Sequence, residues 1–243
     1  MSECENTACG AAMTAPVGQY IEMAKAFAAM SYQGVYLFDL ENSRFVYSSD
    51  YQLSRCGVTE GEMKDKDLSY FIECIPEDEK ALLDDIAHTI QTSYVDLPLE
   101  FKKQITIFLN FHILSGRRKV MVCHKLRMLD FGDSGYPRYL LGLVSPSVHD
   151  GKAFIMACIP GTDYSFQFTA ESRAWESIAA VHLSNDELTM LRLTMQGHSL
   201  EEIGALMFKS PETIKFYRRQ VFLKLNVKNI SEAIAYATHY CLI

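Results

Sequence analysis

The stretch SLEEIGALMFKSPETIKFYRRQVFLKL, residues 199–225, carries the start signals of two consecutive helices. Ser199 followed by Glu202 is a capping box, in which the serine accepts a hydrogen bond from a backbone N–H group and the glutamate reaches back to the cap. Ser210 followed directly by Pro211 supplies an N-cap and a first turn with a preset backbone angle. The stretch therefore predicts one helix after Ser199 and another after Ser210.

Only Phe208 and Lys209 join the two predicted helices, which is the tight connection of a helix-turn-helix. Four residues of the second helix are spaced i, i+3, i+4 and i+7, which puts them on one side of it: Lys215, Arg218, Arg219 and Phe222. Between Lys209 and Lys228 there are six basic residues and one acid, Glu212, so the local charge is +5. Such a helix suits the phosphates and base edges of DNA. A merely solvated basic face is the alternative, and the capped helix that precedes it argues against that alternative.

Two further predicted helices flank this pair. One follows Leu183 and ends at Gly197, and another opens at Ser231 with Glu232. The last 61 residues hold 7 Lys or Arg against 6 Asp or Glu, whereas the residues upstream hold 16 against 24. The net charge of −7 therefore comes from the N-terminal part of the chain.

Residues 183–243 resemble a LuxR-type (GerE-like) DNA-binding domain over their whole length. The matching positions are Leu183, Ser184, Glu187, Leu191, Gly197, Ser199, Glu202, Ile203, Ser210, Thr213, Ile214, Lys215, Lys224, Leu225 and Val227. Two positions depart from the pattern, because Tyr217 replaces the family's usual histidine and Asp186 replaces a common arginine. These departures concern the operator sequence rather than the activity.

The resemblance implies roles for individual residues of this chain. In this family the third helix enters the major groove, which implies that Lys215, Phe216 and Arg219 face bases. Lys209, Thr213 and Arg218 are then expected to hold phosphates. The fourth helix is a dimer contact in the family, and the corresponding candidates here are Ile234, Ala237, Tyr240 and Cys241. Packing within the domain is an equally good reading of these four residues.

The N-terminal part predicts an α+β fold. An amphipathic helix is expected over residues 17–30, a hairpin over 35–50 and a longer helix after Pro76. Strands are expected at 97–104, 105–114, 120–129 and 139–147, joined as an antiparallel meander. Residues 31–146 resemble a PAS domain, chiefly through ECIPEDEKALLDDI (residues 73–86), which is similar to a His-Pro-Glu-Asp turn with Ile75 in place of the histidine.

The predicted fold class is therefore α+β, with a PAS-like antiparallel sheet and flanking helices followed by an all-α, four-helix helix-turn-helix domain. We expect residues 1–30 to form a tail and a helix, 31–150 the PAS-like sensory domain, and 183–243 the DNA-binding domain. Residues 151–182 are expected to connect them through a short strand and then a helix around Trp175.

A ligand pocket is predicted between the sheet and the short helices, lined by Phe38, Phe108, Phe111 and Val122, with a filled core as the alternative. No cofactor is assigned, because the flavin-photosensor motif Gly-x-Asn-Cys is absent and lone histidines such as His88, His112 and His124 are usually ordinary hydrogen-bonded residues. The seven cysteines include no C-x-x-C pair, so no metal site is expected.

Several function classes are disfavoured. No segment predicts a membrane-spanning helix or a signal peptide, and none of the common catalytic motifs occurs, so we expect a cytoplasmic protein that is not an enzyme. The expected function is sequence-specific DNA binding in transcription regulation, by a homodimer on double-stranded DNA, with a small-molecule signal and RNA polymerase as further possible partners. Two alternatives remain: an acyl-homoserine-lactone-type regulator, and a PAS protein-interaction module that binds no operator.

Overall fold

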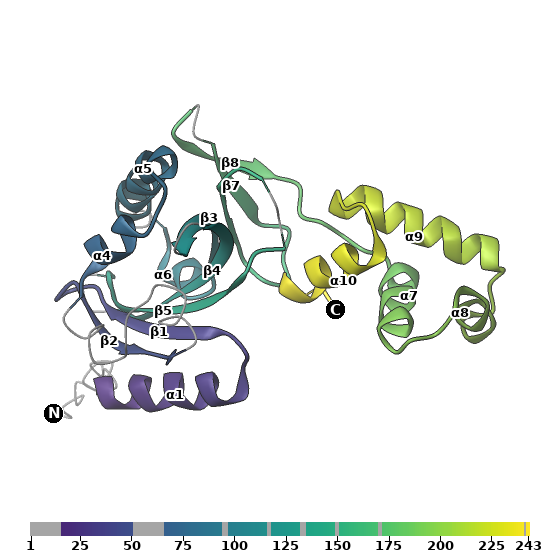
Figure 1. Cartoon of the computed structure of the whole chain (residues 1–243), viewed down its shortest axis with the longest axis horizontal. Coiled ribbons are helices and arrows are strands. Elements are labelled where there is room, and N and C mark those ends of the chain that lie inside the picture. Colours follow the sequence, from purple (N-terminus) through teal and green to yellow (C-terminus); the bar gives the residue numbers. More distant parts are fainter. Residues whose placement is uncertain are drawn as a thin grey trace, which may run out of the picture.

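The protein is described by a computed structural model that covers residues 16–50, 66–93, 97–115, 118–131, 135–148, 151–169, 172–240 and 242–243. The predicted N-terminal tail, residues 1–15, and the dimerisation candidate Cys241 lie outside these described residues. Figure 1 shows an N-terminal lobe built on a sheet and a C-terminal lobe built from helices, with α10 (Ile230–His239) at the junction.

Eight strands form one antiparallel sheet in the order β2-β1-β5-β4-β3-β6-β7-β8. The strands are β1 (Gly34–Asp39), β2 (Arg44–Ser48), β3 (Thr106–Ser115), β4 (Arg118–Phe131), β5 (Pro137–Pro146), β6 (Phe154–Cys158), β7 (Ser165–Thr169) and β8 (Ala174–Ile178). The predicted hairpin is the β1–β2 pair, and the predicted meander is β3, β4 and β5. The α+β class predicted for this lobe is therefore confirmed.

Helices cover both faces of this sheet. They are α1 (Val17–Met30), α4 (Leu68–Glu73), α5 (Glu77–Ser93) and α6 (Leu99–Lys102). The first helix has the bounds that its apolar spacing predicts, and its Ala24 is fully buried. All six residues of β1 are buried, because Tyr36 and Phe38 face the main core while the alternating residues face α1.

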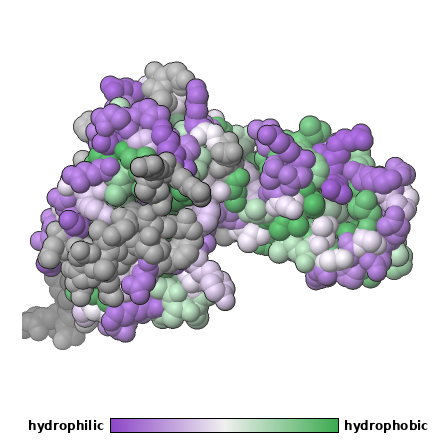
Figure 2. Space-filling view, in the orientation of Figure 1, coloured by the Kyte–Doolittle hydropathy of each residue, from purple (hydrophilic) through white to green (hydrophobic). Residues whose placement is uncertain are grey.

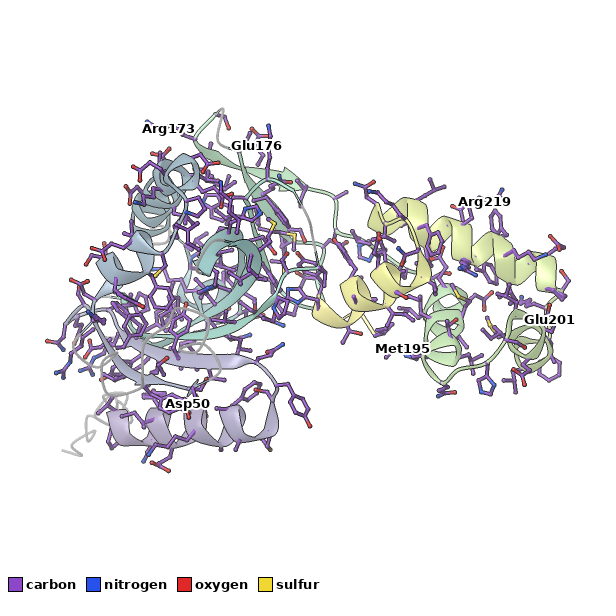
Figure 3. All side chains as sticks on the ribbon, viewed as in Figure 1. Asp50, Arg173, Glu176, Met195, Glu201 and Arg219 are labelled. Atoms are coloured by element: carbon purple, nitrogen blue, oxygen red, sulfur yellow. The ribbon has the colours of Figure 1, made fainter. Side chains whose placement is uncertain are left out.

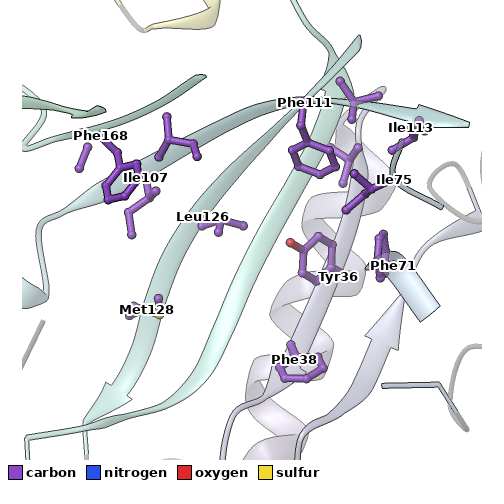
Figure 4. Close-up of a cluster of buried hydrophobic side chains, with 14 of the residues drawn as sticks. Tyr36, Phe38, Phe71, Ile75, Ile107, Phe111, Ile113, Leu126, Met128 and Phe168 are labelled. Carbon is purple, nitrogen blue, oxygen red and sulfur yellow. The ribbon is translucent and has the colours of Figure 1, made fainter. Parts of the chain in front are cut away.

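The main core lies between the sheet and helices α4 and α5 (Figure 4). Aromatic side chains fill its centre, where the ring centroids of Phe38 and Phe45 lie 4.8 Å apart and those of Phe45 and Phe71 lie 5.3 Å apart. Gly142 in β5 permits this packing, because a Cβ atom there would lie 2.1 Å from the ring of Tyr36. Any larger residue at position 142 would push Tyr36 out of the core.

Two predicted elements of this lobe are wrong. The expected strand at residues 97–104 is instead the site of the short helix α6, Leu99–Lys102, because the N–H groups of Phe101 and Lys102 donate to the carbonyl oxygen of Pro98. The expected connecting helix around Trp175 is also absent, since Trp175 lies in β8 and pairs with Phe168 of β7. The segment after residue 150 therefore extends the sheet instead of leaving it.

Four helices form the C-terminal lobe: α7 (Asn185–Met195), α8 (Leu200–Met207), α9 (Pro211–Leu225) and α10. The predicted caps at Ser199 and Ser210 are confirmed, and Ser199 forms its capping box with Glu202. The start of α10 differs from its prediction, because Asn229 rather than Ser231 caps it by accepting a hydrogen bond from the N–H group of Glu232. Within the described ranges, no helix is both long and apolar enough to cross a membrane.

Candidate nucleic-acid interface

A tight turn fixes the angle between α8 and α9. Phe208 ends α8 in the left-handed conformation, with φ of 56°, and the N–H group of Lys209 donates to the carbonyl oxygen of Gly204 over 2.9 Å. A Cβ atom on Gly204 would lie 2.9 Å from the carbonyl oxygen of Lys209, which is closer than real Cβ contacts. The turn therefore depends on glycine at position 204, a requirement that the caps alone did not reveal.

The helix α9 has a buried face and an exposed face. Ile214, Val221 and Leu225 are buried against the other helices of the lobe, which fixes the rotation of α9 about its axis. Lys215 and Arg219, which are expected to face bases, are both exposed on the other side. Figure 3 shows Arg219 on the side of α9 that is turned away from α7 and α8. The surface of the C-terminal lobe in Figure 2 mixes hydrophilic and hydrophobic residues.

Two of the three predicted base-facing residues have distinct local environments. Lys215 Nζ lies 2.7 Å from Glu212 Oε1 in an i,i+3 ion pair, and this carboxylate raises the pKa of the lysine. Phe216 is 54% exposed, although a phenylalanine normally avoids water. An exposed aromatic ring on a helix that also exposes Lys215 and Arg219 is able to contact a thymine methyl group.

The three predicted phosphate-binding residues lie around the start and the middle of α9. The hydroxyl of Thr213 lies 2.9 Å from that of Ser210 and its N–H group donates to the same Ser210 oxygen, so Thr213 belongs to the cap. Arg218 is half-buried, with its guanidinium 5.4 Å from the centroid of the Phe222 ring. Lys209 is exposed in the turn that precedes the cap.

Two polar links hold α9 to α7. Lys224 Nζ lies 2.7 Å from Glu187 Oε2, and the same carboxylate accepts from the N–H group of Ser184. Burial opposes ionisation of Glu187, but the hydrogen bonds from Lys224 and Ser184 outweigh it and lower the pKa of the carboxyl. The buried carboxylate is thus paired, as a charge inside a domain must be.

The second link joins the two residues that depart from the family pattern. Tyr217 donates from its hydroxyl to Asp186 Oδ2, and Lys209 Nζ lies 3.6 Å from the same oxygen. The hydrogen bond from Tyr217 and the charge of Lys209 together lower the pKa of Asp186. Sequence reasoning noted each departure separately and missed that they are partners.

The candidate dimer residues of α10 lie within the chain's own packing. Ala237 is fully buried in the core of the C-terminal lobe, and Ile234 packs against that core. Tyr240 packs on Phe108 of β3, with ring centroids 4.8 Å apart, and His239 Nε2 lies 3.1 Å from Cys123 Sγ of β4. Burial raises the pKa of Cys123 to about 12, so the thiol stays protonated at pH 7. The end of α10 thus contacts the sheet, and dimerisation through it stays a prediction.

The predicted ligand pocket is not one surface. Phe38, Phe111 and Val122 belong to the main core, with exposed fractions of 4% or less. Phe108 lies on the opposite face of the sheet under Tyr240, so its placement in this pocket is wrong. Residues an odd number of positions apart in a strand point to opposite faces, and this rule alone separates Phe108 from Phe111.

The core histidine, His124, is hydrogen-bonded to a tyrosine of the same sheet. The ring of His124 is buried among aromatic rings, and its Nδ1 lies 3.2 Å from the hydroxyl of Tyr36. Burial lowers the pKa of His124 to about 3, so the ring is neutral at pH 7. Across the described ranges, no three His, Cys, Asp or Glu residues cluster in a way that could hold a metal ion.

Comparison with known proteins relates the C-terminal lobe to a family. Residues 181–237 match the family of bacterial regulatory proteins called the luxR family. A 75-residue segment is 35% identical to the putative positive transcription regulator of virulence factors BvgA from Bordetella pertussis, and equally to BvgA from Bordetella bronchiseptica. This segment is 31% of the present chain and 36% of BvgA, so the chain spans about a third of the relatives it matches.

Solved structures with similar architecture are more distant. The chain is 14% identical to the LuxR-type receptor VqmA of Vibrio cholerae, with a TM-score of 0.35, over 90% of this chain and 87% of that one. It is 10% identical to the N-terminal domain of a diguanylate cyclase with a PAS/PAC sensor from Marinobacter aquaeolei, with a TM-score of 0.38, over 47% and 94%. These TM-scores are too low to support an argument about function.

Proposed function

We propose that this chain, whose C-terminal lobe is a LuxR-family helix-turn-helix domain, is a sequence-specific DNA-binding transcription regulator. The N-terminal PAS-like lobe senses a signal or mediates dimerisation, and the protein acts in the cytoplasm as a homodimer on double-stranded DNA. Residues 183–243 are the DNA-binding domain of this proposal, and the sheet-based lobe extends past the expected boundary at residue 150 to Ile178. No catalytic step is part of this function.

The observation that carries the proposal is the exposed face of α9. Its buried residues hold the helix against the lobe, so Lys215, Phe216 and Arg219 stay accessible along one side. An arginine can donate bidentately to guanine O6 and N7, and a lysine can donate to the same acceptors. Lys209, Thr213 and Arg218 lie beside them and supply phosphate contacts that set the register.

The alternatives make different demands. A protein-interaction module would use the same basic face on an acidic partner and would show no preference among duplex sequences. An acyl-homoserine-lactone receptor would need a pocket for a long acyl chain and a polar lactone. The aromatic pocket of such receptors normally includes tryptophans and an Asp-Pro pair, whereas this chain has one tryptophan, Trp175, and no Asp-Pro pair, so this alternative ranks below the first.

The test begins by selecting the duplexes that the protein binds from a pool of random DNA sequences. The most enriched duplex is then footprinted and serves as the operator. Lys215→Ala and Arg219→Ala should each cost about 1–3 kcal/mol on the selected operator and reduce its preference over a scrambled duplex. Arg218→Ala should weaken binding to both duplexes equally and flatten the slope of log K against log salt by about one. Lys25→Ala, which alters the remote α1, is the control for a change in net charge.

The outcome that contradicts the proposal is clear. Random-pool selection that enriches no sequence, with circular dichroism confirming folded helices, would favour the interaction module instead. If Lys215→Ala, like Arg218→Ala, weakens binding to the operator and to the scrambled duplex by the same factor, the assignment of Lys215 to the base-reading face is wrong.

A further inference from the structure

A cavity of about 310 Å³ lies beside the main core, where α6 meets the extension of the sheet. Ile107 and Ala157 form its buried base, and Phe101 of α6, Tyr164, Phe166 and Trp175 form its aromatic walls. The cavity is distinct from the pocket predicted from the sequence, because none of Phe38, Phe108, Phe111 and Val122 lines it. Its lining residues come in part from α6, β7 and β8, whose places in the lobe are labelled in Figure 1.

The walls of the cavity are fixed by contacts outside it. Lys102, the last residue of α6, is 6% exposed and donates from Nζ to the carbonyl oxygen of Gly135 over 3.2 Å. Arg127 of β4 donates to the carbonyl oxygen of Lys103 over 2.7 Å. Trp175 packs edge-on against the buried Phe168, with ring centroids 5.7 Å apart. The cavity is thus a formed pocket whose two sides are anchored independently.

The aromatic side chains at the mouth are unusually exposed. Phe101 is 39% exposed and Phe166 is 36% exposed, and Phe101 meets Tyr164 edge-on with ring centroids 5.9 Å apart. Exposed aromatic surface around a concavity carries a free-energy cost of about 25 cal/mol per Å², which a bound apolar molecule removes. The described residues that line the cavity include no charged side chain, so nothing there would neutralise a carboxylate or an ammonium group.

Volume sets the size of the occupant. An apolar cavity of roughly 150 Å³ holds one benzene molecule, so a cavity of about twice that volume fits two fused rings. A stable protein–protein interface buries roughly 800 Å² on each partner, and a cavity of this size does not offer that area. An acyl chain with a carboxylate head would leave its charge without a cationic partner.

We propose that this cavity is a binding site for a neutral aromatic molecule of about two fused rings. The proposed function includes the sensing of a signal by the N-terminal lobe, and this site is where the signal would bind. The inference rests on the proposed function only for this sensing role. Trp175 lies three residues before the end of β8, and the chain then runs through residues 179–184 into α7. Occupation of the cavity therefore touches the strand that leads into the DNA-binding lobe.

The experiment uses the full chain and two probes of the same shape, neutral 2-naphthol and anionic 2-naphthoate, in calorimetric titrations without DNA. We expect 2-naphthol to bind and to raise the melting temperature, and 2-naphthoate to bind at least about tenfold more weakly. Phe101→Ala removes a wall and Ala157→Leu fills the base, and each should weaken 2-naphthol binding about tenfold or more. Leu114→Ala is the matched control, because Leu114 is 41% exposed on β3 and does not line the cavity.

Several results would overturn the proposal. They are no binding of 2-naphthol to the folded chain, equal binding of the two probes, or binding that Phe101→Ala and Ala157→Leu leave unchanged. A concentration-dependent increase in mass that Phe101→Ala abolishes would place a second copy of the chain on these residues instead. Because the titrations contain no DNA, loss of operator binding cannot be confused with loss of this site.

Discussion

Tyr217 donates a hydrogen bond of 2.7 Å to Asp186 and thereby joins the exposed helix α9 to α7. These are the two residues that replace the histidine and the arginine expected from the family pattern. Asp186 also lies within 3.6 Å of Lys209 Nζ, so its charge opposes that of a proposed phosphate contact. The pair therefore stabilises the lobe and at the same time limits its attraction for DNA.

Asp186→Asn should raise affinity for every duplex several-fold at low salt, because Lys209 is then free to meet a phosphate. The slope of log K against log salt should steepen by about one, as expected for one additional phosphate contact. The measurement is a salt titration on operator and scrambled duplexes. Asp78→Asn on α5 changes the net charge equally and should leave both duplex affinities unchanged. An unchanged slope for Asp186→Asn would show that Lys209 makes no phosphate contact.

Gly204→Ala should destabilise the C-terminal lobe by about 1–3 kcal/mol, because its Cβ atom would press on the carbonyl oxygen of Lys209. This cost opposes the gain of up to about 1 kcal/mol that alanine usually brings to a helix. Gly18→Ala on α1 is the matched control, because a Cβ atom there meets nothing within 4 Å and should be neutral or stabilising. Denaturant unfolding followed by circular dichroism measures both. A stabilising Gly204→Ala would contradict the proposed role of the turn.

Glu187→Gln should lower the free energy of unfolding by roughly 1–2 kcal/mol at pH 7, since glutamine keeps the capping box but loses the charge that Lys224 meets. The folded pKa of Glu187 lies below its ordinary value of 4.5, so this stabilisation is complete above that pH and disappears as the pH falls below it. Wild type and Glu187→Gln should therefore converge in stability as the pH falls from 4.5 through the folded pKa of Glu187.

The control for this pH dependence is Glu202→Gln, since Glu202 forms the same capping box with Ser199 but has no ion-pair partner among the described residues. Its effect on stability at pH 7 should be smaller than that of Glu187→Gln. A difference between wild type and Glu187→Gln that stays constant down to pH 3 would mean that the charge of Glu187 does not supply the stabilisation.

Dimerisation is expected to involve the outer face of α1, where Met23 is 43% exposed and Phe27 is 42% exposed. Light scattering should show about twice the chain mass of 27.6 kDa. Combining Met23→Lys with Phe27→Lys should weaken self-association at least about tenfold. Met195→Lys with Leu206→Lys changes exposed apolar residues of the other lobe and should have no such effect. If the mass of a dimer persists with Met23→Lys and Phe27→Lys but is lost with Met195→Lys and Leu206→Lys, the interface lies on the C-terminal lobe instead.

The local signals in the sequence were sufficient for the helix-turn-helix. The caps at Ser199 and Ser210 act on backbone groups within the next three residues, so a short stretch of sequence is enough to identify them. Both helices start where these caps predict. The same applies to α1, whose apolar spacing is uninterrupted. The roles of Lys215, Phe216 and Arg219 toward DNA stay predictions.

Non-local pairing explains what the sequence could not supply. Residues 97–104 are apolar enough for a strand, yet Pro98 starts a helical turn there. Trp175 sits in a strand only because β7 pairs with it, and no local pattern identifies that partner. The contact of Tyr240 with Phe108 joins residues more than a hundred positions apart, so neither helix nor strand periodicity could reveal it.

The continuation of the sheet into β6 has a practical consequence for anyone dividing this chain. Thr106 to Asn110 of β3 are paired with β6 on one side and with β4 on the other, so a fragment that stops at residue 150 would leave the N–H and C=O groups that face β6 without a neighbouring strand. The bared edge would carry Ile107 and Phe108, which are almost fully buried in the intact chain. Long apolar edges of this kind recruit strands from other molecules. Cleavage there should yield aggregates, whereas a fragment that extends through Ile178 keeps its outermost strand, β8, which is only five residues long and carries the charge of Glu176.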